Sequence, residues 1–544
     1  MNNFESSARR GVGYPLAEAC QKLGNVGQKN IWKECVLSLE FPKLGRDQYD
    51  YQSRILFRLQ ETGSDRSMIG QRIVGELQKY DDIFEKIELS GNGFLNIRLK
   101  KSHIIKELNH LLASEILPIP GPAIKEGGYP EKYNIEFVSA NPTGPLHVGH
   151  GRWAVIGDTL ARLLRAAHHD VETEFYVNNI GNQIELLEAS IRAAQNELPV
   201  PEGGYGGAYI TTIAKKLHPG ESTALHILDD QKKTLRDLKV EFNRYYLEEE
   251  LHRSGEIEKT IRRFEKSGKV YRKDDAEWFR STDFGDDKDR VLRRADGRVT
   301  YFAADVAYHM QKFSRGYTHL LNIWGADHHG YQARMKGALE VLLGREEAEK
   351  LDIKIGQLVS LTRKGAPIRM SKRSGDIITI DEVREEVGID AVRFLLLQTR
   401  PESHLQFDLE LAKEKSEKNP VYYVQYAHAR CASILREAKT RFGEVPVLPQ
   451  IPLDWSFDDA DRIFLQELLD YPDRIFGAAV KEEPHRLYEY AILWTRFFHS
   501  WYHKKRVLVD DPNDRSARLA IVVLARSTLK RMLELMQVTA PEEM

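Results

Sequence analysis

A pair of histidines in this sequence has surroundings that suit phosphate chemistry. The run EFVSANPTGPLHVGHGRW spans residues 136–153 and places His147 and His150 directly after an Asn-Pro and a Gly-Pro turn. Such a turn predicts a strand before it and a helix that starts at the histidines. The N–H groups and dipole at that helix start favour an anion such as a triphosphate, and two imidazoles can donate hydrogen bonds to a phosphoryl group. The alternative is that both histidines only cap the helix.

A short basic run lies some 220 residues further on. In IRMSKRSGDIITIDEV (368–383), Arg369, Lys372 and Arg373 flank a Met-Ser pair, and Ser-Gly follows. A basic loop of this kind can close over a polyphosphate and neutralise charge in the transition state. A solvated surface loop is the alternative. The histidine pair earlier in the chain favours the phosphate interpretation.

The elements around these motifs alternate between strand and helix. Alternating or apolar runs predict strands at 132–140, 170–179 and 318–327, and helical periodicity predicts helices at 151–169 and 331–343. This order indicates an α/β fold with a doubly wound, Rossmann-like parallel sheet, whose ligands bind at the carboxyl ends of the strands.

Composition suggests three domains. The run 117–132 contains four Pro and three Gly, so residues 1–118 are expected to form a separate N-terminal α+β module, with a hairpin around Gly-Asn-Gly in 84–99. Residues 119–410 form the catalytic domain, with a more polar helical insertion at about 190–295. Residues 411–544 are expected to form a helical bundle, since one helix presents a face of large side chains at Leu487, Tyr490, Trp494, Phe497 and Trp501.

Bulk composition excludes several classes of protein. The 544 residues are 42% hydrophobic and 29% charged, with a net charge of −2, which is typical of a folded globular chain. Three scattered cysteines cannot form a disulfide framework or a CxxC zinc site, which favours a reducing compartment. The sequence has neither a long apolar run nor a secretory h-region, so a cytoplasmic protein is expected.

Several separated motifs resemble those of one family. The HVGH and MSK runs are similar to the HIGH and KMSKS signatures of class I aminoacyl-tRNA synthetases. Together with YVNNIGNQ (176–183), TYFAADVAYH (300–309), GADHHGY (325–331) and the closing LMQVTAPEEM, they resemble arginyl-tRNA synthetases over nearly the whole chain. The resemblance implies ATP-dependent ligation of L-arginine to tRNA through an arginyl-adenylate.

The resemblance also implies which residues bind arginine. The arginine-binding residues in this chain would be Glu136, Ser139, Asn141, Tyr301, Asp305 and Gln332. Tyr301 and Asp305 are spaced i,i+4, so they share one face of a helix, and a carboxylate can meet a guanidinium bidentately. Without the family, a core tyrosine and a helix-capping acid would be the preferred interpretations of these two residues.

The same resemblance implies an ATP site and a set of catalytic residues. Those expected at ATP are Gly144, His147, Gly149, His150, Gly325, Asp327, His328, Met370 and Lys372. The catalytic residues would be His147, His150, Lys372 and Arg369, where Arg369 replaces the first Lys of KMSKS. This departure leaves open how the roles divide among the two loop cations and the upstream Arg363 and Lys364.

The expected partners follow from the resemblance. They are ATP with Mg²⁺ carried on it, L-arginine and tRNA(Arg), with the N-terminal module at the tRNA elbow and the helical domain at the anticodon. A monomer is expected, without DNA, a membrane, protein-bound zinc or another resident metal. tRNA is expected to bind before arginine is activated.

Three rival functions remain for comparison. Cysteinyl-type class I chemistry would want a zinc site, which these cysteines cannot build. A small-molecule nucleotidylyltransferase would not need the N-terminal module or the helical tail. A non-catalytic tRNA-binding relative would be expected to lack active-site residues, whereas His147, His150 and Lys372 are all present.

Overall fold

The chain divides into two compact units. The first comprises Met1–Pro130, Ala166–His168 and Pro420–Met544, and the second comprises Glu131–Arg165 and His169–Asn419. The computed structural model describes residues 8–22, 31–40, 42, 48–59, 66–114, 130–218, 220–326, 330–368, 378–443 and 450–544. The first unit thus holds most of the predicted N-terminal and C-terminal domains. The boundaries of the three predicted domains remain a prediction.

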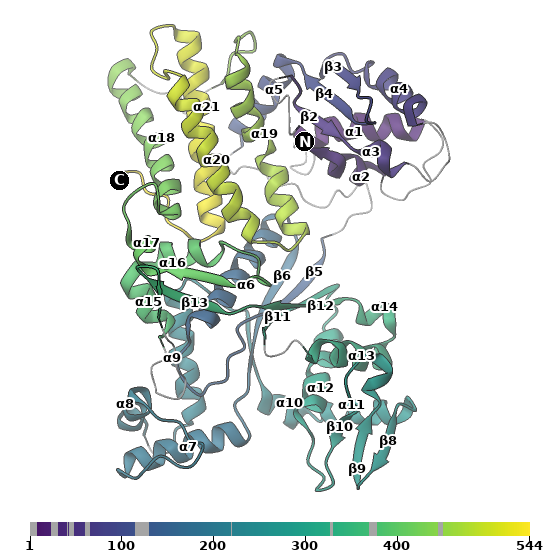
Figure 1. The fold of residues 1–544 in the computed structure, drawn as a ribbon, viewed down its shortest axis with the longest axis vertical. Coiled ribbons are helices and arrows are strands. Elements are labelled where there is room, and N and C mark those ends of the chain that lie inside the picture. The colour runs from purple at the N-terminus through teal and green to yellow at the C-terminus, as the bar shows by residue number, and fades with distance from the viewer. Residues whose placement is uncertain are drawn as a thin grey trace. The chain divides into compact units, whose positions relative to one another are not determined.

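A five-stranded parallel sheet forms the centre of the second unit (Figure 1). Its strands are β5 (Lys132–Glu136), β6 (Asp170–Val177), β7 (Arg244–Leu247), β11 (His319–Gly325) and β12 (Leu351–Gly356). Their spatial order is β12-β11-β5-β6-β7, and every neighbouring pair is parallel. The chain first builds outward from β5 on one side and then on the other, which is the doubly wound order. The direction in which the chain adds strands reverses between β5 and β11. The predicted α/β fold class is confirmed.

Helix α6 (Val148–Ala166) connects β5 to β6 and packs closely on the sheet. A Cβ atom on Gly157 would lie 2.2 Å from Cγ of Phe137, so only glycine allows this approach. Arg152, which is fully buried in α6, donates to three main-chain carbonyl oxygens, those of Gln357, Arg400 and Ser403. The helix that begins at the histidine pair is therefore held firmly along its length.

The segment expected as an insertion at 190–295 is interrupted by a strand of the central sheet. Helices α7 (Asn182–Gln195), α8 (Ala208–Lys216) and α9 (Thr223–Asp237) come first, and β7 then pairs with β6. The expectation of one continuous insertion is wrong at this strand. The sequence obscured it because β7 is a four-residue edge strand between charged residues.

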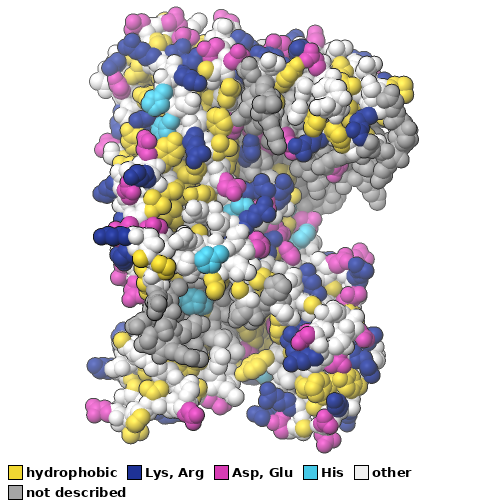
Figure 2. All heavy atoms as spheres, viewed as in Figure 1, with side chains coloured by type: hydrophobic (Ala, Val, Ile, Leu, Met, Phe, Trp, Pro, Cys, Tyr) yellow, Lys and Arg dark blue, Asp and Glu magenta, His cyan; other side chains and the backbone are white. Residues whose placement is uncertain are grey.

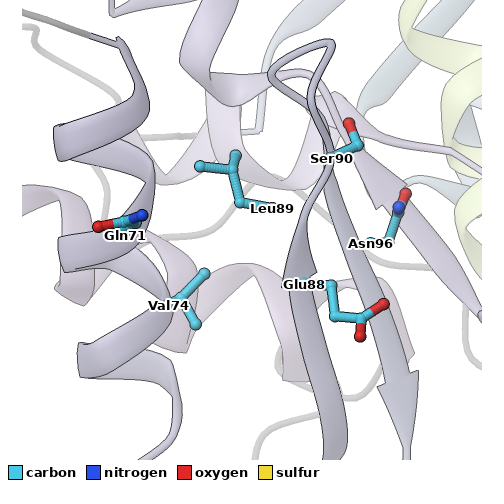
Figure 3. A pocket seen from close by; sticks show the side chains of 6 residues that line it. All are labelled: Gln71, Val74, Glu88, Leu89, Ser90 and Asn96. Carbon is cyan, nitrogen blue, oxygen red and sulfur yellow. The ribbon is translucent and has the colours of Figure 1, made fainter.

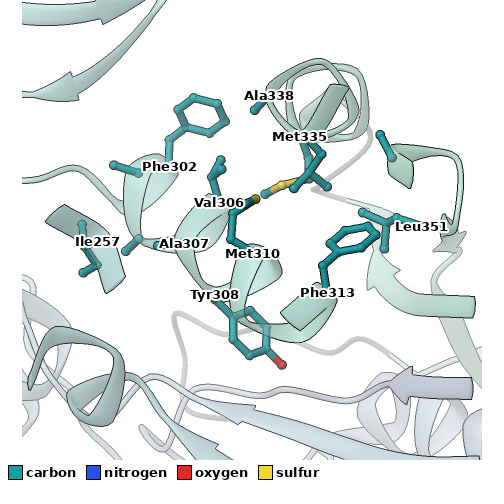
Figure 4. Close-up of a cluster of buried hydrophobic side chains, with 14 of the residues drawn as sticks. Ile257, Phe302, Val306, Ala307, Tyr308, Met310, Phe313, Met335, Ala338 and Leu351 are labelled. Carbon is teal, nitrogen blue, oxygen red and sulfur yellow. The ribbon is translucent and has the colours of Figure 1, made fainter. Parts of the chain in front are cut away.

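A hydrophobic cluster lies beyond β7 (Figure 4). It packs α10 (Glu248–Ser254), α11 (Glu256–Lys266), α12 (Tyr301–Ser314) and α13 (Tyr331–Leu343) with an antiparallel sheet of β8 (Val270–Lys273), β9 (Ala276–Phe279) and β10 (Arg290–Arg293). Helix α13 matches the helix predicted at 331–343. Tyr308 lies at the edge of the cluster, and its hydroxyl points away from the other labelled side chains (Figure 4).

The remaining helices and strands of the second unit come before the basic run in the sequence, overlap its end or follow it. They are α14 (Arg345–Ala348), β13 (Val359–Arg363), β14 (Ala366–Pro367), α15 (Ile380–Val387), α16 (Ile389–Leu396), β15 (Leu405–Asp408) and α17 (Leu409–Lys413). Strand β13 pairs with both β14 and β15. The basic run (368–383) therefore begins directly after β14, and its last four residues belong to α15.

The N-terminal part of the first unit is an α+β module. Its antiparallel sheet has the order β1-β2-β4-β3, with β1 (Leu39–Glu40), β2 (Tyr51–Ser53), β3 (Phe84–Leu89) and β4 (Leu95–Leu99). Its helices are α1 (Ala8–Lys22), α2 (Ile31–Ser38), α3 (Ile55–Arg58), α4 (Arg66–Leu77) and α5 (Lys101–Leu112). The predicted hairpin around Gly-Asn-Gly is confirmed, and Gly93 there has a positive φ of 80°.

Side chains of α4 and of the β3–β4 hairpin line a pocket in this module (Figure 3). The lining residues are Gln71, Val74, Glu88, Leu89, Ser90 and Asn96. Two amides, one hydroxyl and one carboxylate are therefore gathered around it. The pocket offers both hydrogen-bond donors and acceptors.

Four long helices make up the C-terminal part of the first unit and run side by side (Figure 1). They are α18 (Pro420–Phe442), α19 (Asp459–Val480), α20 (His485–Lys504) and α21 (Pro512–Leu535). The predicted apolar face of α20 is confirmed at four positions. Phe498, four residues after Trp494, is fully buried, whereas the predicted Phe497 is only half-buried.

A buried ion pair joins the N-terminal module to the helical bundle. Arg462 of α19 donates to both carboxylate oxygens of Asp50 at 3.0 and 2.7 Å, and both side chains are almost fully buried. Gln466 and the main-chain N–H of Leu99 also donate to Asp50. The module therefore packs on the bundle through charged groups that depend on each other, although a Pro/Gly linker follows it in the sequence.

Lys and Arg side chains are interspersed with Asp and Glu over the face in Figure 2, which agrees with the small net charge of the chain. None of the helices in the described part of the chain is long and apolar enough to span a membrane.

Candidate active site

The histidine pair lies at the N-terminus of α6, as predicted. The two rings are stacked, with centroids 3.7 Å apart. His147 Nδ1 accepts the main-chain N–H groups of Gly149 at 3.1 Å and His150 at 3.3 Å, and His150 Nδ1 accepts that of His147 at 3.3 Å. A neutral ring whose Nδ1 accepts must carry its proton on Nε2. Both rings thus cap the helix and present Nε2–H as their donor, so the two interpretations of the pair are compatible.

Gly149 leaves room for the imidazole of His147. A Cβ atom at this position would lie 3.0 Å from Cε1 of His147. Gly144 is less constrained, because its Cβ atom would lie 3.5 Å from the Tyr209 ring, an ordinary contact distance. Within the described structure, Gly149 allows the two rings to stack, a role that the sequence analysis did not anticipate.

The turn between β5 and α6 has an unusual backbone. Val138 and Ser139 have positive φ angles of 67° and 38°, which costs conformational energy for residues other than glycine. Gln231, buried in α9, donates to the carbonyl oxygens of Asn141 at 3.1 Å and Gly144 at 2.9 Å. Such strain persists where surrounding contacts over-determine it, as is common at functional sites.

Glu136, expected at the arginine, is already surrounded by donors. Its carboxylate accepts hydrogen bonds from Lys312 Nζ at 2.9 Å, Tyr308 Oη at 3.1 Å and Ser139 Oγ at 3.0 Å. Lys312 is fully buried in α12. The charge of Glu136 is therefore matched within the protein, so it is better suited to supporting the site than to meeting a second cation.

A neighbouring carboxylate on β6 is paired in the same way. Glu174 accepts from Arg315 at 2.5 and 3.0 Å. The Tyr308 hydroxyl, which has one proton, is shared between the two carboxylates and lies closer to Glu174, at 2.6 Å. Burial acts to raise the pKa of Glu174, but the hydrogen bonds and charge of Arg315 and the charge of Lys312 outweigh it and lower the pKa to about 2. Glu136 at the end of β5 and its cross-strand partner Glu174 within β6 thus form part of one buried ionic cluster.

Asp305 and Tyr301 lie on α12, with the i,i+4 spacing that the sequence predicted. Tyr301 is 57% exposed, so it is not a core tyrosine. Asp305 is the fifth residue of α12, and the helix cap is made by Thr300, so Asp305 is not a capping acid either. The Asp305 side chain contacts the Tyr331 hydroxyl, and burial, then Asp305, raises the pKa of Tyr331 well above its usual value.

A second carboxylate near Asp305 was missed by the sequence analysis. Glu248 begins α10, is buried, and is hydrogen-bonded to Tyr176. Burial and the negative charge of Asp305 raise the pKa of Glu248 to about 7. The sequence shows Glu248 only as the first residue of a Glu-Glu-Glu run, which is typical of a solvated surface. Two carboxylates and two tyrosines close together suit a cation with several N–H donors.

The other predicted arginine-binding residues are placed as follows. Ser139 donates to Glu136, and its Oγ accepts the main-chain N–H of Tyr176 at 3.1 Å. Asn141 donates to the side chain of Gln183 at 2.8 Å. Gln332 Nε2 donates to the carbonyl of Ile353 at 3.3 Å, so it lies against β12.

Of the predicted ATP-binding residues, Gly325 ends β11 beside the carboxyl end of β5. Asp327, His328, Arg369, Met370 and Lys372 lie outside the described residues. Arg363, by contrast, ends β13 and forms ion pairs with Glu386 at 2.6 Å and with Glu410 at 3.3 Å.

Two residues near the carboxyl end of the basic run lie beside the histidine pair. Thr379 forms a β-bridge with His147, and the N–H of Ile380 donates to the carbonyl of Leu146 at 2.9 Å. A Cβ atom on Gly151 would lie 2.5 Å from Cγ1 of Ile380. Thr379 and Ile380, near the carboxyl end of the basic run, are therefore fixed at the start of α6.

The described residues contain no group of three His, Cys, Asp or Glu side chains that could hold a metal ion. The site thus consists of imidazole donors at a helix N-terminus and carboxylates on α10 and α12, at the carboxyl edge of a doubly wound sheet. This arrangement suits activation of a cationic substrate by a nucleotide triphosphate.

Comparison with known proteins defines the class first. The model for the catalytic domain of class I tRNA synthetases (R) matches residues 124–203. The arginyl-tRNA synthetase N-terminal domain matches residues 16–99, and the DALR anticodon-binding domain matches residues 424–544. Fold, site and matches together define a class I aminoacyl-tRNA synthetase.

The relatives at full length are more specific. The chain is 42% identical over 499 residues to the arginine–tRNA ligase of Moorella thermoacetica, covering 88% of each chain. It is 37% identical to that of Heliobacterium modesticaldum over 100% of both chains. Thermus thermophilus arginyl-tRNA synthetase has the same fold, with a TM-score of 0.78 at 22% identity over 99% of this chain and 100% of that chain. The chain belongs to the arginine–tRNA ligase family.

Proposed function

We propose that this chain joins L-arginine to tRNA(Arg), and that the site described above carries out both steps. The observation that carries the proposal is the placement of Asp305 and Glu248 in the same unit as the His147–His150 pair, at one edge of the sheet. Carboxylates there suit a guanidinium, and the α6 N-terminus suits a triphosphate.

In the first step, the arginine carboxylate attacks the α-phosphorus of ATP and the bond to pyrophosphate breaks. The Nε2–H groups of His147 and His150 donate to oxygens of that phosphoryl group. Lys372 and Arg369 neutralise the departing pyrophosphate. In the second step, a terminal ribose hydroxyl of the tRNA attacks the carbonyl carbon of arginyl-adenylate, and AMP leaves.

Mg²⁺ enters this scheme with ATP. The phosphate oxygens of ATP hold the ion, which adds charge neutralisation to that of the loop cations. The composition of the described site fits this assignment, because its carboxylates are engaged with Lys312, Arg315, Tyr176 and Tyr331.

Within the arginine subsite, Asp305 and Glu248 face the guanidinium, with Tyr301 beside it. Asn141, Ser139 and Gln332 orient the amino acid, and Glu136 supports the subsite through Lys312. A neutral analogue such as citrulline would leave the carboxylates of Asp305 and Glu248 without a cation to meet, which is why the chain would need no editing domain.

The N-terminal module and the helical bundle bind the tRNA. Gln71, Ser90 and Asn96 around the pocket of Figure 3 offer hydrogen-bonding groups of the kind that recognise unstacked bases. The enzyme acts in the cytoplasm as a monomer, and activation of arginine awaits bound tRNA.

The test of the activity is ATP–pyrophosphate exchange with each of the twenty amino acids, with and without tRNA. Exchange that depends on arginine and tRNA supports the proposal. Exchange supported by another amino acid, or by none, contradicts it.

The arginine subsite has its own test, the variant Asp305→Asn. It keeps the shape of the side chain and removes the charge, so arginine affinity should fall at least about 100-fold, as when a buried pair loses one partner. Affinity for ATP should change by less than about threefold. Equilibrium binding of arginine, citrulline and ATP in the presence of tRNA provides the measurement. Unchanged arginine binding would exclude Asp305 from the subsite.

A further inference from the structure

A row of polar side chains connects Asp305 to Glu136 through the interior of the second unit. His309 Nδ1 lies 2.8 Å from the main-chain oxygen of Asp305 and 3.4 Å from its carboxylate Oδ1. His309 Nε2 lies 2.8 Å from Asn322 Nδ2, and Asn322 Oδ1 lies 2.9 Å from Lys312 Nζ. Lys312 Nζ is in turn 2.9 Å from Glu136. Each member except Asp305 is at least nine-tenths buried.

The chemistry of each group sets the direction of these hydrogen bonds. Lys312 can only donate, so the atom of Asn322 that faces it must be the carbonyl oxygen. The NH₂ group of Asn322 therefore faces His309 and donates to Nε2. Since Nε2 accepts, the proton of the neutral imidazole lies on Nδ1, where it donates to the main-chain oxygen of Asp305 at 2.8 Å. The carboxylate Oδ1 of Asp305 lies 3.4 Å from the same nitrogen.

The row lies where strands β5 and β11 meet. Asn322 of β11 is the direct cross-strand partner of Glu136 of β5. Lys312 reaches both of them from α12, about two helical turns beyond Asp305. Helix α12 therefore carries both Asp305, the proposed partner of the guanidinium, and Lys312, the cation that orients Asn322 and Glu136.

We propose that Lys312 and Asn322 keep His309 neutral with its proton on Nδ1, and that all three are positioning residues for Asp305. In this arrangement Asp305 is held in place without losing its negative charge. The proposal deepens the arginine subsite and rests on Asp305 as the partner of the guanidinium. A doubly protonated His309 would be a cation beside Asp305 and would compete with the substrate. A neutral donor holds the carboxylate and leaves its charge available.

The pairing of Lys312 with Glu136 belongs to the same arrangement. An unpaired buried lysine would place its positive charge within the arginine subsite. Glu136 compensates that charge at 2.9 Å. In this arrangement Glu136 acts near the arginine by compensating Lys312, although its own oxygens are engaged.

Two matched variants of His309 test the proposal. In His309→Asn, the side-chain amide nitrogen takes the place of Nδ1 and can still donate to Asp305. In His309→Gln, the terminal amide takes the place of Nε2, so the contact with Asn322 is kept and the donor at Asp305 is lost. The His309→Gln variant should raise the KM for arginine about tenfold, and His309→Asn should stay within about threefold of wild type. The KM for ATP and kcat should change by less than about threefold in both.

A merely structural histidine predicts a different pattern. Both variants would then lower the melting temperature alike, and arginine and ATP would be affected equally. Equal KM values for arginine in the two variants, whether normal or raised, would overturn the proposal.

Asn322→Asp supplies a second test that does not depend on the folding of the His309 variants. An aspartate can still accept from Lys312, but it presents an acceptor to Nε2, which favours a doubly protonated His309. The KM for arginine should rise about tenfold while kcat is retained. An arginine KM equal to that of wild type would overturn the proposal.

The controls separate this proposal from the function on which it rests. Wild-type protein without arginine-dependent exchange would contradict the function. Normal exchange with a normal arginine KM in Asp305→Asn would contradict only the subsite. A third outcome is that exchange depends on arginine and Asp305→Asn weakens arginine binding, while His309→Gln and Asn322→Asp behave like wild type. This outcome would contradict only the role of the polar row.

Discussion

At the scale of single residues, the two histidines combine a structural role with the chemical role that we propose for them. Each Nδ1 caps a main-chain N–H at the start of α6, and this contact directs the donor to Nε2. Because the capping bonds fix the orientation of the two rings in advance, the Nε2–H donors need no reorganisation during the reaction. Substituting either histidine should therefore affect both the helix start and the chemistry.

We expect His147→Ala and His150→Ala each to slow adenylate formation by about 10²–10³-fold, the usual effect of removing an oxyanion-type donor. Loss of the cap should also destabilise the protein by about 1 kcal/mol. Single-turnover activation and urea unfolding measure the two effects. Unchanged activation in either variant would remove that histidine from the catalytic set.

The raised pKa of Glu248 predicts a pH dependence of arginine binding. With a pKa of about 7, Glu248 is about one-tenth ionised at pH 6 and about nine-tenths ionised at pH 8. A cation favours the ionised form, so arginine affinity should rise with pH over this range, by up to about tenfold. Titration calorimetry of arginine binding at several pH values between 6 and 8 measures this change in affinity.

Glu248→Gln should abolish this pH dependence, because the neutral amide does not titrate. Glu250→Gln is the matched control, since Glu250 lies in the same turn of α10 but is exposed. A pH profile that persists in Glu248→Gln would assign the titration to another group.

At the scale of elements, the start of α6 joins the two motifs. The bridge from Thr379 to His147 fixes one end of the basic run, and α15 begins directly after it with a capping box at Thr379. The other end follows β14, which pairs with β13. The described residues on either side of Arg369 and Lys372 thus belong to regular structure.

We expect Lys372→Ala to impair catalysis more than Arg369→Ala. Lysine is a compact charge that can follow a departing pyrophosphate, and Lys372 occupies the retained basic position of the motif. Pyrophosphate exchange compares the variants, with Arg363→Ala as a control because Arg363 is engaged with Glu386 and Glu410. A larger loss in Arg369→Ala would mean that the assumed register of the motif is wrong.

At the scale of the whole molecule, the first unit is joined by charges from distant parts of the chain. Asp50 and Arg462 are 412 residues apart and both are buried. Removing one partner leaves the other as an uncompensated buried charge, which typically costs about 3–5 kcal/mol. A Pro/Gly linker alone suggests that residues 1–118 could be removed without unfolding the rest, but this pair argues otherwise.

We expect deletion of residues 1–118 both to raise the KM for tRNA and to destabilise the helical bundle, because Arg462 loses Asp50. In the deleted protein, Arg462→Met should restore part of the stability by removing the orphaned charge. Denaturant unfolding and aminoacylation measure the two effects. In the full chain, Asp50→Asn should cost about 3–5 kcal/mol, while the exposed Asp459→Asn should cost less than about 1 kcal/mol. An equally stable deletion variant would make the module an independent domain.

The sequence by itself determined the features that depend on residues close together in the chain. The Asn-Pro and Gly-Pro turn, the period of α6 and α20, and the hairpin around Gly93 follow from local backbone preferences and side-chain spacing. Those signals, with the motifs, were enough for the fold class, the histidine pair and the spacing of Tyr301 and Asp305.

Only the tertiary structure decided which charges remain available to a substrate. The Glu136–Lys312 pair spans 176 residues, and Glu248 looked like part of an exposed acidic run until folding buried it beside Asp305. Likewise β7 was hidden among polar residues, and Phe498 rather than Phe497 faces the core of the bundle. Pairing and burial depend on distances between segments that are remote in sequence, and the energy of a charge depends on that environment far more than on its neighbours along the chain.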